Sequence, residues 1–437
     1  MSRMANGTAV GRVRRLASRP LVLWIAFLVV HLVLGLLCLT GDGMGDVDNV
    51  YKPWAEWAAQ GAPIMGVQVP WVYPFAALVP IMLPLLLGAN GYVAGWLAMV
   101  IILNAGAFAV LIGGRDPRRL LAAWWWLGFL LLLGPVGIAR LDAVSVAIAI
   151  VGLLWLNLHE KAAIATLTIA TWIKVWPAAL IASALIALRS RRHIALVGLV
   201  TSAIIAAVPL IFGAGMNVLS FITAQTGRGL QIESPVSTIW MWRAAWHDPD
   251  IVIYYDRQIL TFQVVGPGTT TASSLMNPLL GAAVILVVLI GIRAVRLGTP
   301  VTRMLPELSL AFICAFITFN KVGSPQYVAW LAAPVILGLV YQGRGFRIPA
   351  VLAVAAAGLT QLFYPYLYDS LLLAEPWAVT VLTVRNLLYF VLLGWAITAL
   401  WGRSRHADAA GDRIPLSVWP FRPEPAAIPP AVARLER

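Results

Sequence analysis

Apolar runs about twenty residues long recur along almost the whole chain, separated by short polar segments. Within a run the apolar positions neither alternate nor form a single helical stripe, so the run has no polar face to turn toward water. A helix of about twenty apolar residues matches the roughly 30 Å hydrocarbon thickness of a bilayer. The pattern predicts an all-α polytopic membrane protein and argues against a large soluble protein with several cores.

The runs predict about twelve membrane-spanning helices, in a range of about 11 to 13. Toward the two ends of the chain the spans are expected near 21–40, 194–213, 276–296, 304–319, 326–341, 348–366 and 376–401. The middle of the chain allows two arrangements. In the first arrangement, spans near 73–89, 92–113, 120–135, 141–158 and 163–188 complete the twelve.

The second arrangement breaks the helix 161–188 at "KVWP", 174–177, and leaves one apolar run between 73 and 113 that does not cross fully. The proline of this motif removes a helix hydrogen bond, and Lys174 requires water or an anionic partner. The first arrangement also puts the basic turn "GRDPRR", 114–119, outside, although Lys and Arg favour the cytoplasmic side. We therefore favour the second arrangement.

Positive charge predicts the orientation of the chain. Arginines lie beside the expected cytoplasmic ends of the spans: Arg12, Arg14, Arg15, Arg19, Arg293, Arg296, Arg303, Arg344, Arg347, Arg403 and Arg405. Both termini are then cytoplasmic, and the loops 41–72 and 216–275 are external. The first apolar stretch is long and lacks a clear cleavage site, which predicts an uncleaved span rather than a signal peptide. Residues 1–401 form one transmembrane domain, followed by a tail, 402–437, expected to be disordered and cytoplasmic.

Composition agrees with a multi-pass protein of the cell membrane and limits which partners and cofactors are expected. The chain is 61% hydrophobic, with only 11% charged residues and a net charge of +13. Because the cations cluster beside the spans, the charge is assigned to membrane orientation, and no nucleic-acid partner is expected. Cys38 and Cys314 lie in apolar runs, and the five histidines have no ligand spacing, so we expect no metal and no cofactor.

The acidic residues are distributed unevenly along this topology. Of the 18 acids, eleven are expected at or near the external face: Asp42, Asp46, Asp48, Glu56, Asp142, Glu233, Asp248, Asp250, Asp256, Asp369 and Glu375. The sequence therefore predicts that any chemistry takes place at the external face of the membrane.

The first external loop contains "GDGMGDVDNVYKPWAEWAAQG", 41–61, which combines acids with aromatic residues at helical spacing. This spacing predicts a short amphipathic helix at the membrane interface. The acids are either solvated loop charges or, for one of them, a general base tuned by its surroundings. Asp46 and Asp48 are two residues apart, so a helix or turn directs them differently and only one is expected to point into a site.

Cations form the second set of candidates. Arg140 and Asp142 either pair at a helix end, or Arg140 meets a phosphate, for which its planar fork is suited. Lys174, inside an apolar run, either snorkels to the interface or serves a function. Lys321 lies on an expected external turn, against the charge preference, which a bound anionic group would explain.

Further polar and aromatic candidates surround these charges. The substrate-binding candidates are Tyr51, Tyr73, Arg228, Gln231, Glu233, Ser324, Gln326 and Tyr327. Tyr73 has a simpler interpretation as an interfacial anchor, and Arg228 and Glu233 have one as an ion pair. In "GRGLQIESPVSTIWMW", 227–242, the tryptophans, Gln231 and Glu233 together suit a sugar, because aromatic faces stack on pyranose CH groups while amides and carboxylates bind hydroxyls.

Several of these motifs occur in an order that resembles a known superfamily. They are "GDVDNVYKPW", "WVYPFAALVP", "KVWPA", "RGLQIESP" and "NKVGSPQYVAWL", spread between about residues 41 and 332. The series resembles the polyprenol-phosphate-sugar-dependent glycosyltransferases of the GT-C superfamily. Within it, the actinobacterial α-mannosyltransferases of glycosyltransferase family 87 are the most similar branch.

The resemblance implies a multi-span helical enzyme that moves a sugar, mannose in this branch, from a polyprenyl-phosphate donor to a glycolipid or polysaccharide acceptor. An aspartate of the first external loop would deprotonate the acceptor hydroxyl; Asp46 and Asp48 both qualify, and we favour Asp46. The donor phosphate leaves, so Lys321, Lys174 and Arg140 are the candidates to bind it. Membrane lipids surround the site, and direct displacement inverts the anomeric configuration. No metal is obligatory.

Two other classes of protein remain open at this stage. A transporter or flippase of a lipid-linked saccharide would place polar groups near the membrane midplane and often shows repeat symmetry. The third class is a non-catalytic membrane scaffold. The external concentration of acids and the cations on that face favour the glycosyltransferase.

Overall fold

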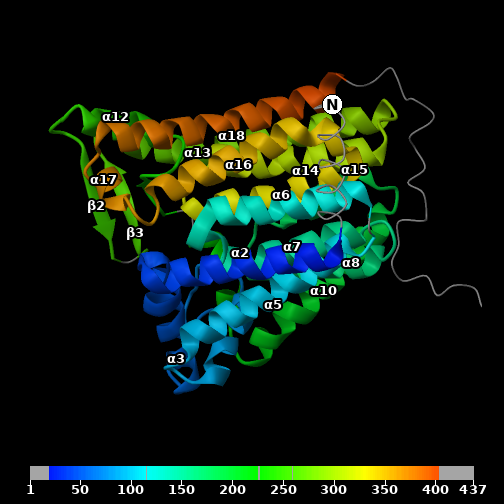
Figure 1. Ribbon diagram of the computed structural model, residues 1–437. Coiled ribbons are helices and arrows are strands. Elements are labelled where there is room, and N and C mark those ends of the chain that lie inside the picture. Colours follow the sequence, from blue (N-terminus) through cyan, green and yellow to red (C-terminus); the bar gives the residue numbers. More distant parts are fainter. Residues whose placement is uncertain (1–18, 115, 225–226, 258, 403–437) are drawn as a thin grey trace, which may run out of the picture.

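The computed structural model describes residues 19–114, 116–224, 227–257 and 259–402, which are arranged as one elongated bundle of helices with a small sheet at one end (Figure 1). About 76% of the described residues are helical. Residues 403–437 of the tail predicted to be disordered lie outside the described residues, as do Arg12, Arg14 and Arg15, whereas Gly402 is the last residue of α18. The structure therefore addresses the transmembrane domain expected over 1–401.

The bounds of the elements follow chain order. The longer helices are α2 (Pro20–Thr40), α5 (Tyr92–Ile112), α6 (Pro117–Leu133), α7 (Leu141–Trp155), α8 (Glu160–Ile173), α9 (Ala178–Ala187), α10 (Arg191–Ile211), α13 (Thr269–Arg296), α14 (Val301–Thr318), α15 (Ala332–Gln342), α16 (Arg347–Phe363) and α18 (Pro376–Gly402). The short helices are α3 (Lys52–Ala59), α4 (Leu78–Met82), α11 (Ser220–Thr223), α12 (Thr238–Ala245) and α17 (Tyr368–Leu372). The strands are β1 (Leu230–Gln231), β2 (Val252–Asp256) and β3 (Thr261–Val265). A π-helical turn, η2 (Val47–Tyr51), and the 3₁₀ segments η1 (Asp42–Met44), η3 (Phe75–Ala77), η4 (Leu83–Leu87), η5 (Gly134–Gly137), η6 (Gly215–Leu219), η7 (Pro325–Leu331) and η8 (Gly343–Phe346) join them.

Length and composition identify a membrane-embedded protein. Among the described residues, eight segments are long and apolar enough to cross a bilayer: Pro20–Thr40, Tyr92–Ile112, Pro117–Gly137, Arg191–Ile211, Thr269–Arg296, Val301–Thr318, Pro325–Phe363 and Pro376–Gly402. These eight do not confirm the predicted count of about twelve. Several predicted spans form shorter helices: α7 has 15 residues, α8 has 14 and α9 has 10.

The favoured arrangement of the middle of the chain agrees with the structure. Helix α8 ends at Ile173, Lys174 has an extended backbone, and α9 begins at Ala178, so the predicted break at 174–177 is confirmed. The apolar run Phe75–Leu87 is divided into η3, α4 and η4, and at about 1.5 Å per residue it measures only about 20 Å. It is too short to cross as a single straight helix.

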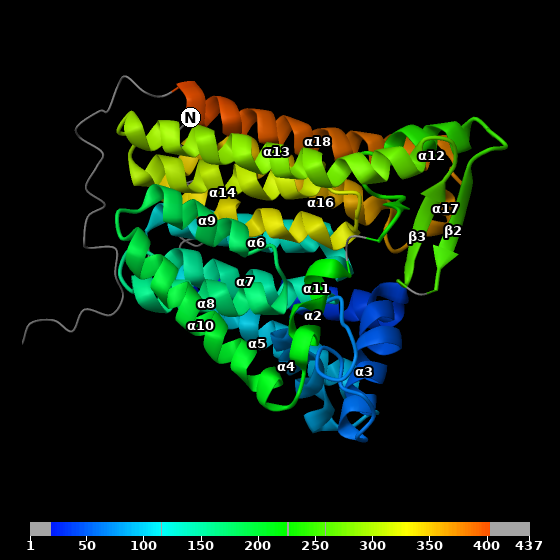
Figure 2. The ribbon, with the colours of Figure 1, turned by 180° about the vertical axis from the view of Figure 1, so that it is seen from behind.

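The bundle has two unlike ends, visible in both orientations (Figures 1 and 2). The long connections 41–74, 212–268, 319–324 and 364–375 gather at one end, which we name the loop end. Short turns at 113–116, 156–159, 188–190 and 297–300, with η8, gather at the other end, named the turn end, where α2 begins and α18 ends. The described acids among the eleven assigned to the external face all lie at the loop end. The loop end and the turn end therefore differ in their content of these acidic residues.

A small sheet at the loop end, within the loop 216–275, departs from the predicted all-α fold class. The strands pair antiparallel in the order β1–β3–β2, with Tyr255 opposite Phe262 and Tyr254 opposite Gln263. The segments "VIYYD" and "TFQVV" are rich in the β-branched and aromatic residues that favour strands. One face of the sheet packs with α12, α17 and α18 in a separate apolar cluster. In the other long loop, the predicted short helix is present as α3.

Candidate active site

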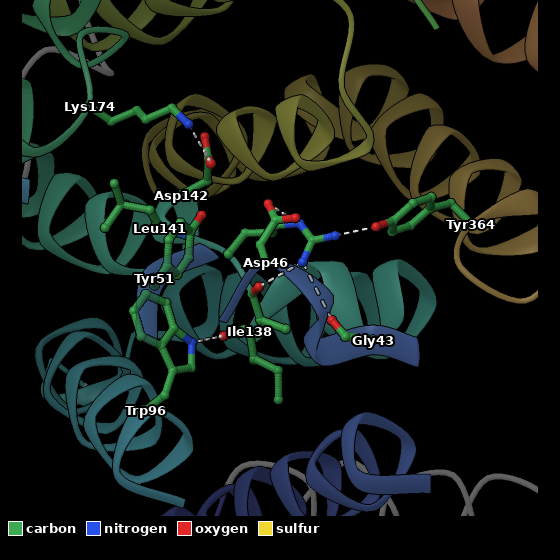
Figure 3. Close-up of polar contacts among 11 residues, drawn as sticks. Gly43, Asp46, Tyr51, Trp96, Ile138, Leu141, Asp142, Lys174 and Tyr364 are labelled. Carbon is green, nitrogen blue, oxygen red and sulfur yellow. Dashed lines mark hydrogen bonds and ion pairs between the residues drawn. The ribbon is translucent and has the colours of Figure 1, made fainter. Parts of the chain in front are cut away.

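The start of α7 is the centre of the polar structure at the loop end. Arg140 precedes the helix, and its guanidinium is almost completely buried. Its Nε lies 3.2 Å from Oδ2 of Asp46, Nη1 donates to the carbonyl of Ala139 at 3.0 Å, and Nη2 donates to the hydroxyl of Tyr364. Figure 3 shows Asp46 and Tyr364 converging on this guanidinium from different parts of the chain. Arg140 thus joins the first loop to the segment after α16.

Local sequence permits this close approach. A Cβ on Gly43 would lie 2.7 Å from Cβ of Pro135, so a larger residue would push the first loop away from the η5 turn. At the first residue of α7, the backbone N–H of Leu141 donates to the hydroxyl of Tyr51 at 3.3 Å. Tyr51 is itself buried against Trp96. The first loop is therefore fixed to the helix start by both backbone and side-chain contacts.

Asp46 and Asp48 have different surroundings. The side chain of Asp46 is 37% exposed and is held by the buried Arg140. The side chain of Asp48 is 51% exposed, and its contact is with Lys52, four residues along the same helical segment, at 3.4 Å. Burial opposes the charge of Arg140, but Asp46 together with nearby tyrosine hydroxyls outweighs burial and leaves the pKa of Arg140 raised. Of the two carboxylates, Asp46 is the one that reaches the helix start.

A second ion pair lies on the other side of α7. Asp142 is fully buried, with Nζ of Lys174 at 3.0 Å from Oδ2 and the indole N–H of Trp330 donating to Oδ1 at 2.6 Å. The Lys174 ammonium also sits 4.7 Å from the ring centroid of Tyr73. Burial lowers the pKa of Lys174, but Asp142 together with Tyr73 and Tyr327 more than offsets burial and raises the pKa overall. Lys174 is consequently neutralised within the protein and does not snorkel to solvent.

A third pair links the sheet region to the last helix. Glu233 is buried; its Oε2 lies 3.4 Å from Nη1 of Arg385, and its Oε1 accepts from the hydroxyl of Tyr368 at 3.1 Å. Arg385 also donates to the main-chain carbonyl of Glu233 at 2.9 Å. Burial raises the pKa of Glu233 to about 7, although Arg385, Tyr368 and Arg140 each oppose that rise. The sequence expectation of an Arg228–Glu233 pair is wrong, because Arg385 takes that place.

Arg228 and Lys321 form a cationic group of a different kind. Lys321 is buried, and burial together with the charge of Arg228 lowers its pKa. No ion pair within the described part of the chain involves Arg228, and its buried Nε has no hydrogen-bond partner there. Gln231, whose N–H donates to the Lys321 carbonyl at 3.1 Å, has a buried Oε1 that is likewise unsatisfied among these residues. These orphaned polar atoms indicate a place for a polar ligand.

The remaining candidates lie beside these groups. Tyr327 stacks on Trp330, the partner of Asp142, with ring centroids 4.1 Å apart. Ser324 and Gln326 are half-buried at the start of η7. A Cβ on Gly323 would lie 2.2 Å from the main-chain nitrogen of Ser234, so this turn rests directly on the segment after β1. The structure thus brings the predicted site residues of both external segments to one end of the bundle.

Three functional candidates were not found from the sequence. Tyr364 and Tyr368 lie in a connection without a recognisable motif, and Arg385 lies inside a predicted span. The signal for Arg385 was present, because a lone arginine in an apolar run is as unusual as Lys174. Trp240 and Trp242, considered as a sugar platform, donate their indole N–H groups to Pro267 and Thr383 and belong to the packing around α12.

A search for metal-binding groups and comparisons with known proteins complete the description of the site. Across the described ranges, no group of three or more His, Cys, Asp or Glu side chains is placed to hold a metal ion. Comparison with protein-family models, with curated proteins and with solved structures finds no match to this chain. The arrangement of the side chains themselves is therefore the basis for a functional proposal.

Proposed function

We propose that the protein is an integral-membrane glycosyltransferase that moves a sugar from a polyprenyl-phosphate donor to an acceptor hydroxyl at the loop end. The observation that carries the proposal is the pairing of half-exposed Asp46 with buried Arg140. One carboxylate oxygen is fixed at 3.2 Å from the guanidinium, and the side chain still reaches solvent. A carboxylate held in this way is oriented for general-base chemistry.

The proposed reaction is a single displacement. Asp46 takes the proton from the acceptor hydroxyl while that oxygen bonds to the anomeric carbon. The bond from that carbon to the donor phosphate oxygen breaks, and the phosphate leaves with the electron pair. Attack opposite the leaving group inverts the anomeric configuration. Holding both lipid-borne reactants at one interface contributes proximity and orientation.

We place the leaving phosphate at Arg228 and Lys321. Arg140 and Lys174, also considered for this role from the sequence, already have carboxylate partners, and displacing Asp142 from Lys174 would leave a carboxylate charge buried. Arg228 and Lys321 repel each other, and an anion between them relieves that repulsion. The orphaned Gln231 Oε1 is an acceptor for a sugar hydroxyl on the same donor.

The proposed orientation has the loop end outside and the turn end in the cytoplasm. In this arrangement the shorter helices α7, α8, α9 and α15 complete about twelve crossings, and both termini are cytoplasmic. The basic turns, with Arg118, Arg119 and Arg303, then lie on the side that the charge preference requires. Asp46 and the donor phosphate meet at the external leaflet.

A lipid-saccharide flippase is the second candidate. The helix broken between α8 and α9 at Lys174, with a buried ion pair at the break, resembles the discontinuous helices of transporters. The concentration of the candidate groups at one end of the bundle favours the transferase, because a transporter binds its substrate near the midplane.

The test uses purified full-length protein in liposomes with radiolabelled polyprenyl-phosphate-mannose and a mannolipid acceptor. The proposal expects label in the acceptor, no transfer from GDP-mannose, and loss of transfer when the acceptor is omitted. Movement of the intact donor between leaflets without labelled product would instead support the flippase.

A further inference from the structure

A continuous series of aromatic rings runs from the exposed strand of the sheet to the candidate base. The members are Tyr255, Phe262, Tyr368 and Tyr364, which we name the aromatic track. Ring centroids are 5.0 Å apart for Tyr255 and Phe262, 5.9 Å for Phe262 and Tyr368, and 5.0 Å for Tyr368 and Tyr364. The Arg140 guanidinium carbon lies 5.5 Å from the Tyr364 centroid. The track therefore ends at the residue that holds Asp46.

The sheet register explains how the track begins. Tyr255 and Phe262 are directly opposite each other on neighbouring antiparallel strands, so their side chains share one face. Farther along the same face, Val264 is buried against the apolar cluster, whereas Tyr255 is 45% exposed. This face of the sheet is therefore packed in the core at Val264 and accessible at Tyr255. The sheet and the first loop lie close together in Figures 1 and 2.

We propose that the aromatic track binds the saccharide portion of the acceptor, so that the acceptor is an oligosaccharide chain rather than a single sugar or a bare lipid headgroup. The inference rests on the proposed function and specifies its acceptor. Aromatic faces contact the CH faces of sugar rings, and phenol hydroxyls exchange hydrogen bonds with sugar hydroxyls. The track consists of uncharged side chains, which suits a neutral ligand of this kind.

Electrostatics supports the placement of the acceptor saccharide along the aromatic track. Burial, followed by the nearby Asp46 carboxylate, raises the pKa of Tyr255. Burial also raises the pKa of Tyr364 despite the opposing charge of Arg140, and Asp46 and Glu233 add to the rise. Both phenols therefore keep their protons at neutral pH and remain hydrogen-bond donors. Because Asp46 and Tyr364 both contact the Arg140 guanidinium, a chain lying along the track presents its terminal hydroxyl near this carboxylate.

The test measures saccharide binding and transfer separately, with the full-length protein in nanodiscs. The probe is α-1,6-linked mannotetraose, compared with methyl mannoside, and binding is followed by saturation-transfer NMR and calorimetry. Tyr255→Ala is the test variant, and Tyr255→Phe retains the ring. Tyr254→Ala is the matched control, since Tyr254 is similarly exposed at 41% but points to the opposite face of the strand.

We expect Tyr255→Ala to weaken mannotetraose binding about fivefold or more, with little change for methyl mannoside, Tyr255→Phe or Tyr254→Ala. Absence of mannotetraose binding by the wild type, or equal loss in the Tyr254 and Tyr255 variants, overturns the inference. A dimer that Tyr255→Ala dissociates, without saccharide binding, also overturns it and assigns the face to a second copy of the chain.

The two proposals fail in different ways. Saccharide binding with this variant pattern but without sugar transfer contradicts the glycosyltransferase and retains the binding track. Transfer at wild-type rates and acceptor KM in Tyr255→Ala, for both tetrasaccharide and monosaccharide acceptors, retains the enzyme and contradicts the track.

Discussion

The two ends of the bundle use cations in opposite ways. At the turn end, exposed Arg118 donates to the carbonyl of Tyr341 at 2.9 Å, and Arg293 donates to the carbonyl of Trp401 at 3.1 Å. At the loop end, three ion pairs join distant segments, Arg140–Asp46, Lys174–Asp142 and Arg385–Glu233, and their cations are buried or nearly so. These two turn-end arginines bind carbonyls near helix ends, whereas the three loop-end cations each bind a carboxylate.

Under the proposed function, this difference separates charge that orients the protein in the membrane from charge that forms a site. Carbonyl contacts near helix ends use groups that every helix leaves without an intrahelical partner. These three loop-end pairs instead join segments up to 152 residues apart, and each holds a cation largely away from water at a considerable desolvation cost. The contrast supports the proposed placement of the function at the loop end, and the following changes test it.

The largest stability effect is expected for Lys174→Met. It leaves the fully buried Asp142 without its cation, which should lower the free energy of unfolding by about 3–5 kcal/mol. Adding Asp142→Asn should recover much of the loss, because no buried charge remains. Lys52→Met is the control, since its half-exposed partner Asp48 predicts a change of about 1 kcal/mol or less. Thermal unfolding in detergent gives the comparison, and equal losses in the two lysine variants would contradict it.

Glu233 predicts a pH dependence of stability. Its pKa is raised by burial from an ordinary 4.5 to about 7, so the folded state binds a proton more tightly than the unfolded state. The resulting stabilisation is complete below pH 4.5 and is lost as the pH rises through about 7, with a size on the order of 3 kcal/mol. The difference in Tm between wild type and Glu233→Gln, followed from pH 4.5 to 8, should show this decline. A difference that is independent of pH contradicts the assignment.

Arg228→Ala tests the placement of the donor phosphate. Loss of one charge-assisted hydrogen bond to the phosphate should raise the KM for the lipid donor about tenfold to a hundredfold. Lys321→Met should act in the same direction, and the acceptor KM should change little in both variants. An Arg228 variant with normal donor KM would place the phosphate elsewhere at the loop end.

The smallest effect is expected for Arg118→Ala at the turn end. This side chain is exposed, and its contact is with a main-chain carbonyl, so the free energy of unfolding should change by about 1 kcal/mol or less. Transfer activity should be unchanged. Strong loss of transfer activity in Arg118→Ala would contradict the proposal that the function lies at the loop end and not at the turn end.

Local chemistry made much of this organisation predictable. Apolar runs indicated the membrane helices, the proline and lysine of "KVWP" indicated the break after α8, and the acids indicated a polar end. The strands β2 and β3 were missed although their composition favours strands, because they lie inside an external loop of a chain predicted to be all-α. Their pairing depends on tertiary contacts with α17 and α18.

The ion-pair partner of each charged residue was the less predictable part of the site. The sequence placed Arg140, Lys174 and Lys321 together as phosphate ligands, yet two of these three are paired with carboxylates that only the fold brings to them. The pairing of Glu233 with Arg385 likewise depends on how the last helix packs. Ion pairs between distant segments have no local spacing rule, so their partners emerge only with the three-dimensional arrangement.

The central claim is tested most directly by comparing Asp46→Asn with Asp48→Asn in the sugar-transfer assay. These carboxylates are two residues apart, but only Asp46 is held by the buried Arg140. The account predicts that Asp46→Asn lowers kcat by at least about a hundredfold, with donor KM nearly unchanged, while Asp48→Asn transfers sugar at close to the wild-type rate. Wild-type transfer by Asp46→Asn would contradict the account.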